Sequence, residues 1–255
     1  LILFYGKLLL FLNNLAIFSE KELKLSQNCA ILIKILGLRW FGMDKNKYEI
    51  VRLRMERTAK ALRRNNMLCE CAENAAEALD ILQDMLDEGS TIAVGGSMSL
   101  FEADVIDELR AGDYHFLDRY EKGLTREQIK QIFRDSFSAD VYITSTNAVT
   151  ENGELYNVDG NGNRVAAMLY GPDSVIVLAG YNKIVKDIDE AKARVEAMAA
   201  PANAVRLSTE TPCRTTGQCM HCHSDDRICA DFVVMSRQRT KDRVKVILVA
   251  EELGY

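Results

Sequence analysis

The stretch TIAVGGSMSLFEADVIDELR, residues 91–110, decides the fold. Its first four residues are apolar or β-branched and predict a short buried strand. The strand runs into a loop with two adjacent glycines, and a helical pattern starts at residue 99. A strand that passes through a short loop into a helix is the repeating step of an α/β protein.

The same alternation of strand and helix continues on both sides of this stretch. Further helices are predicted at residues 47–65, 74–86, 125–137 and 164–171. Asn74 is expected as an N-cap, and Thr125 with Gln128 has the spacing of a capping box. Further strands are predicted at residues 67–73, 114–120, 139–146, 174–180 and 244–250. This alternation predicts an α/β fold with a mostly parallel sheet.

The composition limits the classes of function. The chain has 255 residues, of which 48% are hydrophobic and 27% charged, values that are ordinary for a globular protein. The formal charge is −5, and no long basic run is present. Because nucleic-acid binding needs clustered Lys and Arg, we exclude nucleic acid as the main partner. A small anion stays a candidate, since backbone amides bind anions without net charge.

Residues 1–42 differ from the rest of the chain. They begin with an apolar segment, but Lys7, Asn13 and Asn14 interrupt the roughly 20 apolar residues that a transmembrane helix needs. The segment also lacks the small-residue cleavage site of a signal peptide. We therefore expect a leader that precedes a natural start at Met43 and is not part of the native domain. We expect no membrane segment in the native form.

Two parts are expected after the leader. The α/β pattern gives way to a cysteine-rich segment after residue 207. We therefore place an α/β domain at residues 43–207. Residues 208–255 are expected to form a cysteine-rich carboxy-terminal extension that packs on this domain.

The glycine loop predicts an anion site. Gly95 and Gly96 let backbone amides approach a ligand, Ser97 and Ser99 offer hydroxyl groups, and Met98 lies between them. The N-terminus of the following helix adds partial positive charge. The loop lacks the spacing of a dinucleotide or triphosphate fingerprint. The alternative interpretation is a tight turn between strand and helix with a serine cap.

The loops after the strand at residues 139–146 are rich in polar side chains. Open α/β sheets bind ligands at the carboxyl ends of their strands, so we expect these loops to line the site. The candidate ligand-binding residues here are Thr146, Asn147, Asn152, Asp159, Asn161, Asn163 and Arg164. The alternative is that Asn, Asp and Gly serve turn geometry alone.

Candidates for acid and base catalysis are few. A transferase or isomerase would need a carboxylate, for which Glu102 and Glu151 are the candidates, although Glu102 can instead complete a capping box with Ser99. The chain has no G-x-S-x-G or H-E-x-x-H motif, and His115 lies in a predicted strand, where we expect a structural role. A serine–histidine hydrolase is therefore not supported.

The segment CRTTGQCMHCHSDDRIC, residues 213–229, holds four of the seven cysteines. No export signal is evident, so we expect a cytoplasmic protein, in which clustered cysteines are more often metal ligands than disulfides. The predicted metal ligands are Cys213, Cys219, Cys222 and Cys229, which would hold a [4Fe–4S] cluster or, as the alternative, zinc. Their spacing matches neither a ferredoxin nor a two-knuckle zinc module, and a redox or disulfide pair stays open. His221 and His223 flank Cys222 and need a bend of the loop to lie beside it.

Three segments resemble the LUD-domain, or lactate-utilisation, family. They are GGSMSL at residues 95–100, the run from ADVYITST to YNKIV at residues 139–185, and RVEAMAAPANAVRL at residues 194–207. The resemblance covers residues 43–255 and is closest to the short stand-alone branch. It implies a fold similar to the NagB/RpiA/CoA-transferase group, with a Rossmann-like sheet, helices on both faces and a site at the strand ends. It also implies oxidation of L-lactate to pyruvate beside iron–sulfur proteins.

Together these observations favour a protein that binds a small carboxylate or phosphorylated metabolite. We expect a role in redox metabolism of hydroxy acids such as L-lactate, with iron–sulfur redox proteins as partners. One alternative is a non-catalytic, metal-containing subunit or scaffold, and another is a transferase or isomerase of the wider fold group. The sequence does not decide whether the protein is an enzyme or a homo-oligomer.

Overall fold

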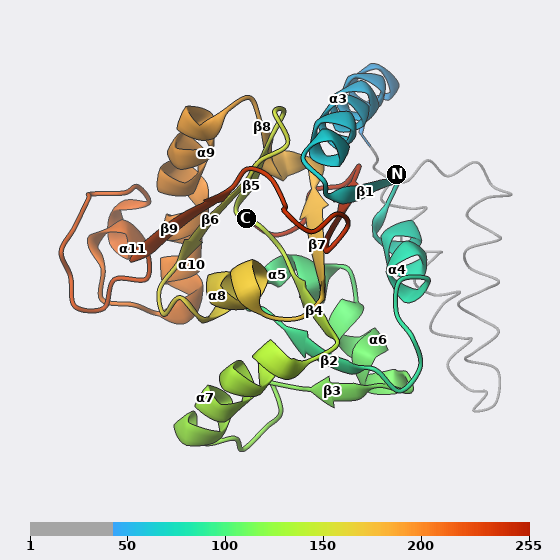
Figure 1. Ribbon diagram of the computed structural model, residues 1–255. Helices are drawn as coiled ribbons and strands as arrows, with labels where there is room; N and C mark the ends of the chain where they lie inside the picture. Colours follow the sequence, from blue (N-terminus) through green and yellow to red (C-terminus); the bar gives the residue numbers. More distant parts are fainter. Residues whose placement is uncertain (1–42) are drawn as a thin grey trace, which may run out of the picture. The chain divides into compact units, whose positions relative to one another are not determined.

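The main sheet of the protein is parallel throughout. The computed structural model describes residues 43–255, so the predicted leader lies outside the described residues. Six strands form this sheet in the order β1-β10-β7-β4-β2-β3 (Figure 1). They are β1 (Leu68–Ala72), β2 (Thr91–Val94), β3 (His115–Leu117), β4 (Val141–Thr144), β7 (Ser174–Gly180) and β10 (Val244–Val249). The predicted α/β class with a parallel sheet is confirmed.

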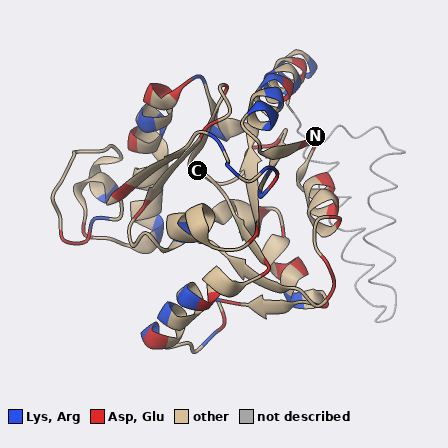
Figure 2. Ribbon diagram, in the orientation of Figure 1, with Lys and Arg blue, Asp and Glu red and all other residues tan. Residues whose placement is uncertain are grey.

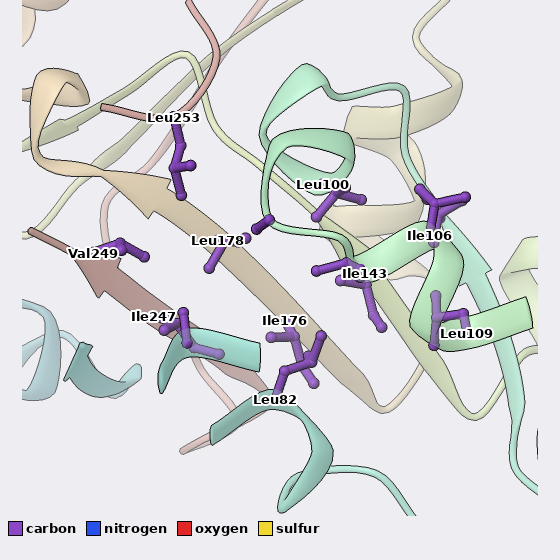
Figure 3. Packing of buried hydrophobic residues seen from close by; sticks show 14 of the residues in the cluster. Leu82, Leu100, Ile106, Leu109, Ile143, Ile176, Leu178, Ile247, Val249 and Leu253 are labelled. Carbon is purple, nitrogen blue, oxygen red and sulfur yellow. The ribbon is translucent and has the colours of Figure 1, made fainter. Parts of the chain in front are cut away.

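One face of the main sheet packs against three helices. They are α4 (Ala75–Gln83), α5 (Met98–Glu102) and α6 (Val105–Ala111). Figure 3 shows how Leu82, Leu100 and Leu109 from these helices gather with Ile143 and Ile176 from β4 and β7. Alternate residues of a strand point to opposite faces, so one apolar face of the sheet is buried by this cluster.

The single helix predicted from residue 99 to residue 110 is two helices in the structure. Asp104 has a left-handed backbone with φ of 55°, which ends α5 and lets α6 start in a new direction. The predicted caps of other helices are confirmed. Asn74 accepts a hydrogen bond from the Glu77 amide, and Thr125 and Gln128 form the capping box of α7 (Arg126–Asp135).

The opposite face of the sheet carries α8 (Asn163–Tyr170). Tyr142 precedes Ile143 in β4 and therefore points away from the leucine cluster. Burial raises the pKa of Tyr142, and the positive charge of Arg164 on α8 opposes this shift. Helices thus cover both faces of the sheet, as expected.

The long helix α3 (Lys45–Arg64) packs through one apolar side. Met55, Ala59 and Leu62 on this side are buried. Gly153 lies so close to α3 that a Cβ at this position would be 2.5 Å from the carbonyl carbon of Ala61. Gly153 also has a positive φ. The turn that contacts α3 therefore requires glycine at this position for two reasons, the close approach and the backbone conformation.

A second, smaller sheet has four strands in the order β8-β5-β6-β9. They are β5 (Ala148–Thr150), β6 (Leu155–Asp159), β8 (Ile184–Val185) and β9 (Asp231–Met235). The helix α9 (Ile188–Arg194), a π-helical turn (Val195–Ala199) and α10 (Ala200–Leu207) follow β8. Ala148, Tyr156, Ala191 and Val195 form the buried cluster between this sheet and these helices. Short 3₁₀ turns lie at Ser136–Ser138 and Tyr181–Lys183, and α11 spans Pro212–Thr216.

The carboxy-terminal segment at residues 208–255 differs from the expected extension. Its strand β9 pairs with β6, and its strand β10 lies inside the main sheet between β1 and β7. Contacts also unite Asn46–Tyr255 in one compact unit. The physical reason is that β10, with the buried run VKVILV, supplies an interior strand without which β1 and β7 have no partner on that side. The cysteine segment is therefore an insertion before an interior strand.

Charged residues of both signs lie along the helices α3 and α7, whereas the strands of the main sheet are nearly free of charge (Figure 2). This distribution is expected when the sheet is buried between layers of helices. No helix within residues 43–255 has the length and apolar content that crossing a membrane requires.

Candidate functional site

A cavity of about 380 Å³ opens where the glycine loop after β2 meets the loops that follow β4 and β6. Most of the residues predicted to bind a ligand line this cavity. They are Gly96, Ser97, Met98, Thr146, Asn147, Asp159, Asn161, Asn163 and Arg164. The site therefore lies at the carboxyl ends of parallel strands, as expected from the general rule for open α/β sheets.

The two adjacent glycines have different roles. A Cβ at Gly95 would lie 2.4 Å from the Thr144 hydroxyl oxygen, so Gly95 is required for close packing between β2 and β4. A Cβ at Gly96 would be 3.5 Å from Nη1 of Arg119, which is an ordinary contact. Gly96 lines the cavity and Gly95 does not. The glycine loop thus brings Gly96 beside the guanidinium group of Arg119, which was not among the predicted site residues.

The two serines of the loop also separate. Ser97 lines the cavity and is the N-cap of α5, without a capping bond from its side chain. Ser99 is fully buried behind the cavity wall, where its hydroxyl donates to the Leu253 carbonyl at 3.0 Å. The proposed capping box of Ser99 and Glu102 is wrong, because Glu102 instead accepts a hydrogen bond from the Gly254 amide at 2.6 Å.

Lys183 is the main residue of the site that sequence reasoning missed. It lines the cavity, yet it is only 3% exposed. Its Nζ donates to Ser99 Oγ at 2.8 Å and to Ser145 Oγ at 3.0 Å. Burial lowers the pKa of Lys183 to about 7. The available signal was its place just after the buried strand β7, at the same end of the sheet as the glycine loop.

Arg164 connects the loop after β4 of the main sheet to β6 of the second sheet through hydrogen bonds. Its guanidinium donates to Asn157 Oδ1 at 2.6 Å and to the carbonyl oxygens of Ser145 and Val158 at 3.0 and 2.9 Å. Its Nε lies 3.4 Å from a carboxylate oxygen of Asp159. Because these protein groups occupy most of its donors, Arg164 fixes the cavity wall, and Asp159 neutralises its charge.

Two further arginines line the cavity, Arg119 and Arg206. The Arg119 guanidinium lies 4.4 Å from the ring centre of Phe133, and within the described chain it forms no ion pair. Arg206 donates twice to Asn203 Oδ1, at 2.9 and 2.7 Å. No acidic side chain in the described part of the chain neutralises either guanidinium group at the cavity.

Tyr255 adds an unsatisfied hydroxyl to the same cavity. Among the residues that the structure describes, its buried hydroxyl oxygen has no hydrogen-bond partner of normal geometry. Burial raises the pKa of Tyr255, and the nearby charge of Arg206 opposes this shift. Buried polar groups are nearly always hydrogen-bonded, so an unpaired hydroxyl at a cavity wall indicates a place for a ligand or water.

Besides Gly95 and Ser99, three further predicted site residues lie outside the cavity. Glu151 pairs with Arg54 at 2.7 Å and with Arg57 at 3.4 Å, both on α3. The backbone carbonyl of Asn152 accepts a bond from Asn65 just after α3, at 3.0 Å. Glu102 holds the carboxy-terminal segment, as described above. The structure therefore does not bring either candidate carboxylate to the ligand-binding residues, because the turn after β5 points toward α3.

The cysteine segment forms a second cavity of about 270 Å³. Cys213, Cys219, Cys222, Cys229, His221 and His223 all line it. The chain bends at His221, which has a left-handed φ of 47°, and this bend brings both histidines to the cavity. All cysteines in the described range are free thiols.

The donor set of this second cavity suits a thiolate-bound metal, but the positions of the side chains do not. Within residues 43–255, no three Cys, His, Asp or Glu side chains gather closely enough to hold a metal ion. Cys219 Sγ is 3.9 Å from His221 Nδ1, near the separation of two ligands of one metal, but within the described residues no third ligand joins this pair. A bound metal would require the loop at residues 217–230, which has no regular secondary structure, to close further.

The two cavities share a wall. Ile228 lines both of them. A Cβ at Gly160 would be 3.2 Å from the Ile228 carbonyl oxygen, and the Ala230 amide donates to the Asp159 carbonyl at 2.9 Å. The cysteine segment is therefore not remote from the ligand-binding residues, because its residue Ile228 forms part of the wall of the first cavity.

An α/β protein with a basic cavity at the carboxyl ends of its parallel strands is the class that this fold and site define. The LUD domain matches residues 55–249, and the chain belongs to this family. The resemblance seen in the sequence is confirmed at that level.

Solved structures give weaker likenesses. A DUF162 family protein from Deinococcus radiodurans is 15% identical, with a TM-score of 0.47, over 78% of this chain and 98% of that one. The α subunit of a malonate decarboxylase from Acinetobacter baumannii is 13% identical, with a TM-score of 0.33, over 83% of this chain and 38% of that one. eIF2B delta from Chaetomium thermophilum is 18% identical, with a TM-score of 0.31, over 45% and 49%. No curated protein matches the chain.

Proposed function

We propose that this LUD-domain protein binds a small anionic metabolite in the 380 Å³ cavity. The observation that carries the proposal is the charge of the cavity wall. Arg119, Arg164, Lys183 and Arg206 line it, and Asp159 is its one acidic side chain among the described residues. Since Asp159 pairs with Arg164, the other basic groups face the cavity without an acidic side chain of residues 43–255 as partner.

The size and position of the cavity agree with such a ligand. Its volume lies at the lower end of the range for small-molecule sites. Guanidinium groups bind carboxylate and phosphate by paired hydrogen bonds, so Arg119 and Arg206 suit either chemical class. The unpaired hydroxyl of Tyr255 offers a further hydrogen bond.

Within these anions we favour small hydroxy and oxo acids such as L-lactate and pyruvate. Membership of the LUD family supports this choice. We propose that the protein acts in redox metabolism of hydroxy acids beside iron–sulfur proteins. The free thiols of the described chain suit a reducing compartment such as the cytoplasm. Phosphorylated metabolites are the competing class, and the same experiment separates the two.

Calorimetric titration with L-lactate, pyruvate and inorganic phosphate tests the proposal. The variant Arg119→Met keeps an unbranched side chain over the Phe133 ring but loses the charge. We expect at least about a tenfold loss of affinity for the anion that binds, because a charged hydrogen bond contributes roughly 1.5–3 kcal/mol. Arg134→Met, on the exposed side of α7, is the matched control and should bind normally. Equal affinity in the two variants would contradict the proposal.

The cysteine segment supports a second candidate function, a metal-containing subunit. Four thiols and two imidazoles line one cavity, which is the donor set of a [4Fe–4S] cluster or a zinc site. The shared wall at Ile228 would make such a site a structural support of the ligand cavity. No reaction step is assigned to it, because the present side-chain positions do not converge on a metal.

A further inference from the structure

Lys183 is a buried amine to which the described chain gives no ion-pair partner. Its two hydrogen bonds go to the hydroxyl groups of Ser99 and Ser145. A buried ammonium group without a carboxylate is costly, because it loses the hydration that it has in water. The environment therefore favours the neutral amine, which has a free electron pair.

Two of the three charged groups that affect Lys183 lower its pKa, as burial does. Burial is the largest cause of its lowered pKa of about 7, and Arg194 on α9 and Arg164 on α8 lower it further. Glu102 on α5 opposes them, but it is held by the Gly254 amide. A large fraction of the amine is consequently neutral at physiological pH, whereas an exposed lysine is almost fully protonated.

The other residues of the cavity suit a molecule whose carboxylate is adjacent to the group that contacts Lys183. Arg119 and Arg206 line the same cavity as Lys183, and no acidic side chain within the described range neutralises their guanidinium groups. A carboxylate bound to either arginine would hold the neighbouring carbon atoms of a short acid inside this small cavity. Proximity of this kind is a large part of the advantage of an intramolecular reaction.

We propose that Lys183 forms an imine with the carbonyl group of a small 2-oxo acid bound in this cavity. The inference rests on the proposed function and names both the substrate class and the reacting residue. The Nζ electron pair adds to the carbonyl carbon, the carbonyl oxygen takes a proton, and the resulting carbinolamine loses water as the carbon–nitrogen double bond forms. No oxidant or reductant is needed. Ser99 and Ser145, which touch Nζ, are placed to receive and return its protons.

The chemistry separates oxo acids from hydroxy acids. The second carbon of L-lactate is tetrahedral and bears a hydroxyl group, so an amine cannot form an imine with it. Pyruvate has a carbonyl at the same position and can. L-lactate and pyruvate both have the carboxylate that the arginines would bind. A comparison of these two compounds therefore distinguishes anion binding from imine formation.

Reductive trapping tests the proposal on the full chain. The protein is incubated with pyruvate and sodium borohydride at pH 8, and its intact mass and peptides are measured. We expect a mass increase of one pyruvic acid less one oxygen atom, located on the peptide that contains Lys183. L-lactate should give no increase. Lys183→Met and Lys183→Arg should lose the adduct, and Lys186→Met, which removes an exposed lysine of the same segment, should keep it.

Each outcome decides between the claims. If calorimetry shows pyruvate binding but no adduct forms on Lys183, the imine is excluded and the anion site stands. If pyruvate neither binds nor reacts, both the imine and the carboxylate form of the proposed function are overturned. An adduct spread evenly over surface lysines also overturns the imine. The wild-type peptide map gives these answers even if a Lys183 variant fails to fold.

Discussion

Lys183 Nζ donates a hydrogen bond to Ser99 Oγ at 2.8 Å, and Ser99 in turn donates to the Leu253 carbonyl at 3.0 Å. This short chain joins three distant parts of the sequence: the helix after the glycine loop, the turn after β7 and the carboxy-terminal segment. The wall of the ligand cavity is thus fixed by a buried polar network, and such networks are sensitive to the loss of any one member.

Ser99→Ala should destabilise the protein while Ser97→Ala should not. The first change leaves the Leu253 carbonyl without its donor and Lys183 with one fewer acceptor, so we expect a loss of roughly 1–3 kcal/mol in the free energy of unfolding. Ser97 makes no side-chain capping bond, and its removal should change stability by no more than about 0.5 kcal/mol. Denaturant titration of both variants checks this order, and the reverse order would contradict it.

The buried amine should also make stability depend on pH. In the folded protein the pKa of Lys183 is about 7, whereas an unfolded lysine has a pKa of about 10.4. Between these values the unfolded state binds more protons, so the free energy of unfolding rises with pH, by at most about 1.4 kcal/mol per unit. Below pH 7 both states are protonated and this contribution is flat.

Chemical denaturation at pH 7, 8 and 9 measures this slope. Lys183→Met has no titrating amine, so its curve should lack the part of the slope that Lys183 supplies. The difference between wild type and variant isolates Lys183, because all other titrating groups are present in both. Parallel curves over this range would show that Lys183 keeps an ordinary pKa in the folded protein.

The two glycines of the loop should respond oppositely to alanine. Gly95→Ala places a methyl group 2.4 Å from the Thr144 hydroxyl oxygen, and we expect a loss of about 1–3 kcal/mol in stability. Gly96→Ala meets only Arg119 Nη1 at 3.5 Å, so the fold should tolerate it. The methyl group would nevertheless cover part of the guanidinium, and anion affinity should fall. Thermal unfolding and anion titration of both variants test this division, which fails if Gly96→Ala is the less stable variant.

Local patterns in the sequence predicted those structural features that are determined by residues close together in the chain. The buried strands, the capping box at Thr125 and the glycine loop each have a signal within a few residues. The second sheet had almost none, because strands such as β8, Ile184–Val185, are too short to show a period. Ser97 and Ser99 could not be told apart, because the predicted helix began at residue 99, whereas α5 begins at Met98 with Ser97 as its N-cap.

The charged residues of the site were likewise predicted only where a local pattern indicated them. Arg164 was predicted, because it lies in a polar loop after a strand. Arg206 was not, because its place at the cavity depends on how α10 folds back onto the main sheet. Lys183 was missed although its 3₁₀ turn follows β7 directly. Glu151 was a reasonable candidate by position along the chain, yet the turn that carries it points to Arg54 on α3.

Anaerobic purification tests the metal-containing candidate. We expect a brown protein whose visible absorbance bleaches on reduction, with iron and sulfide bound, because four thiols line one cavity. The double variant Cys219→Ser and Cys222→Ser should lose this absorbance, and Cys71→Ser, which removes an exposed thiol of β1, should keep it. A colourless protein with stoichiometric zinc would replace the cluster by the alternative metal. A metal-free protein with all four thiols open to alkylation would contradict both, and would agree with the separated side-chain positions seen in the structure.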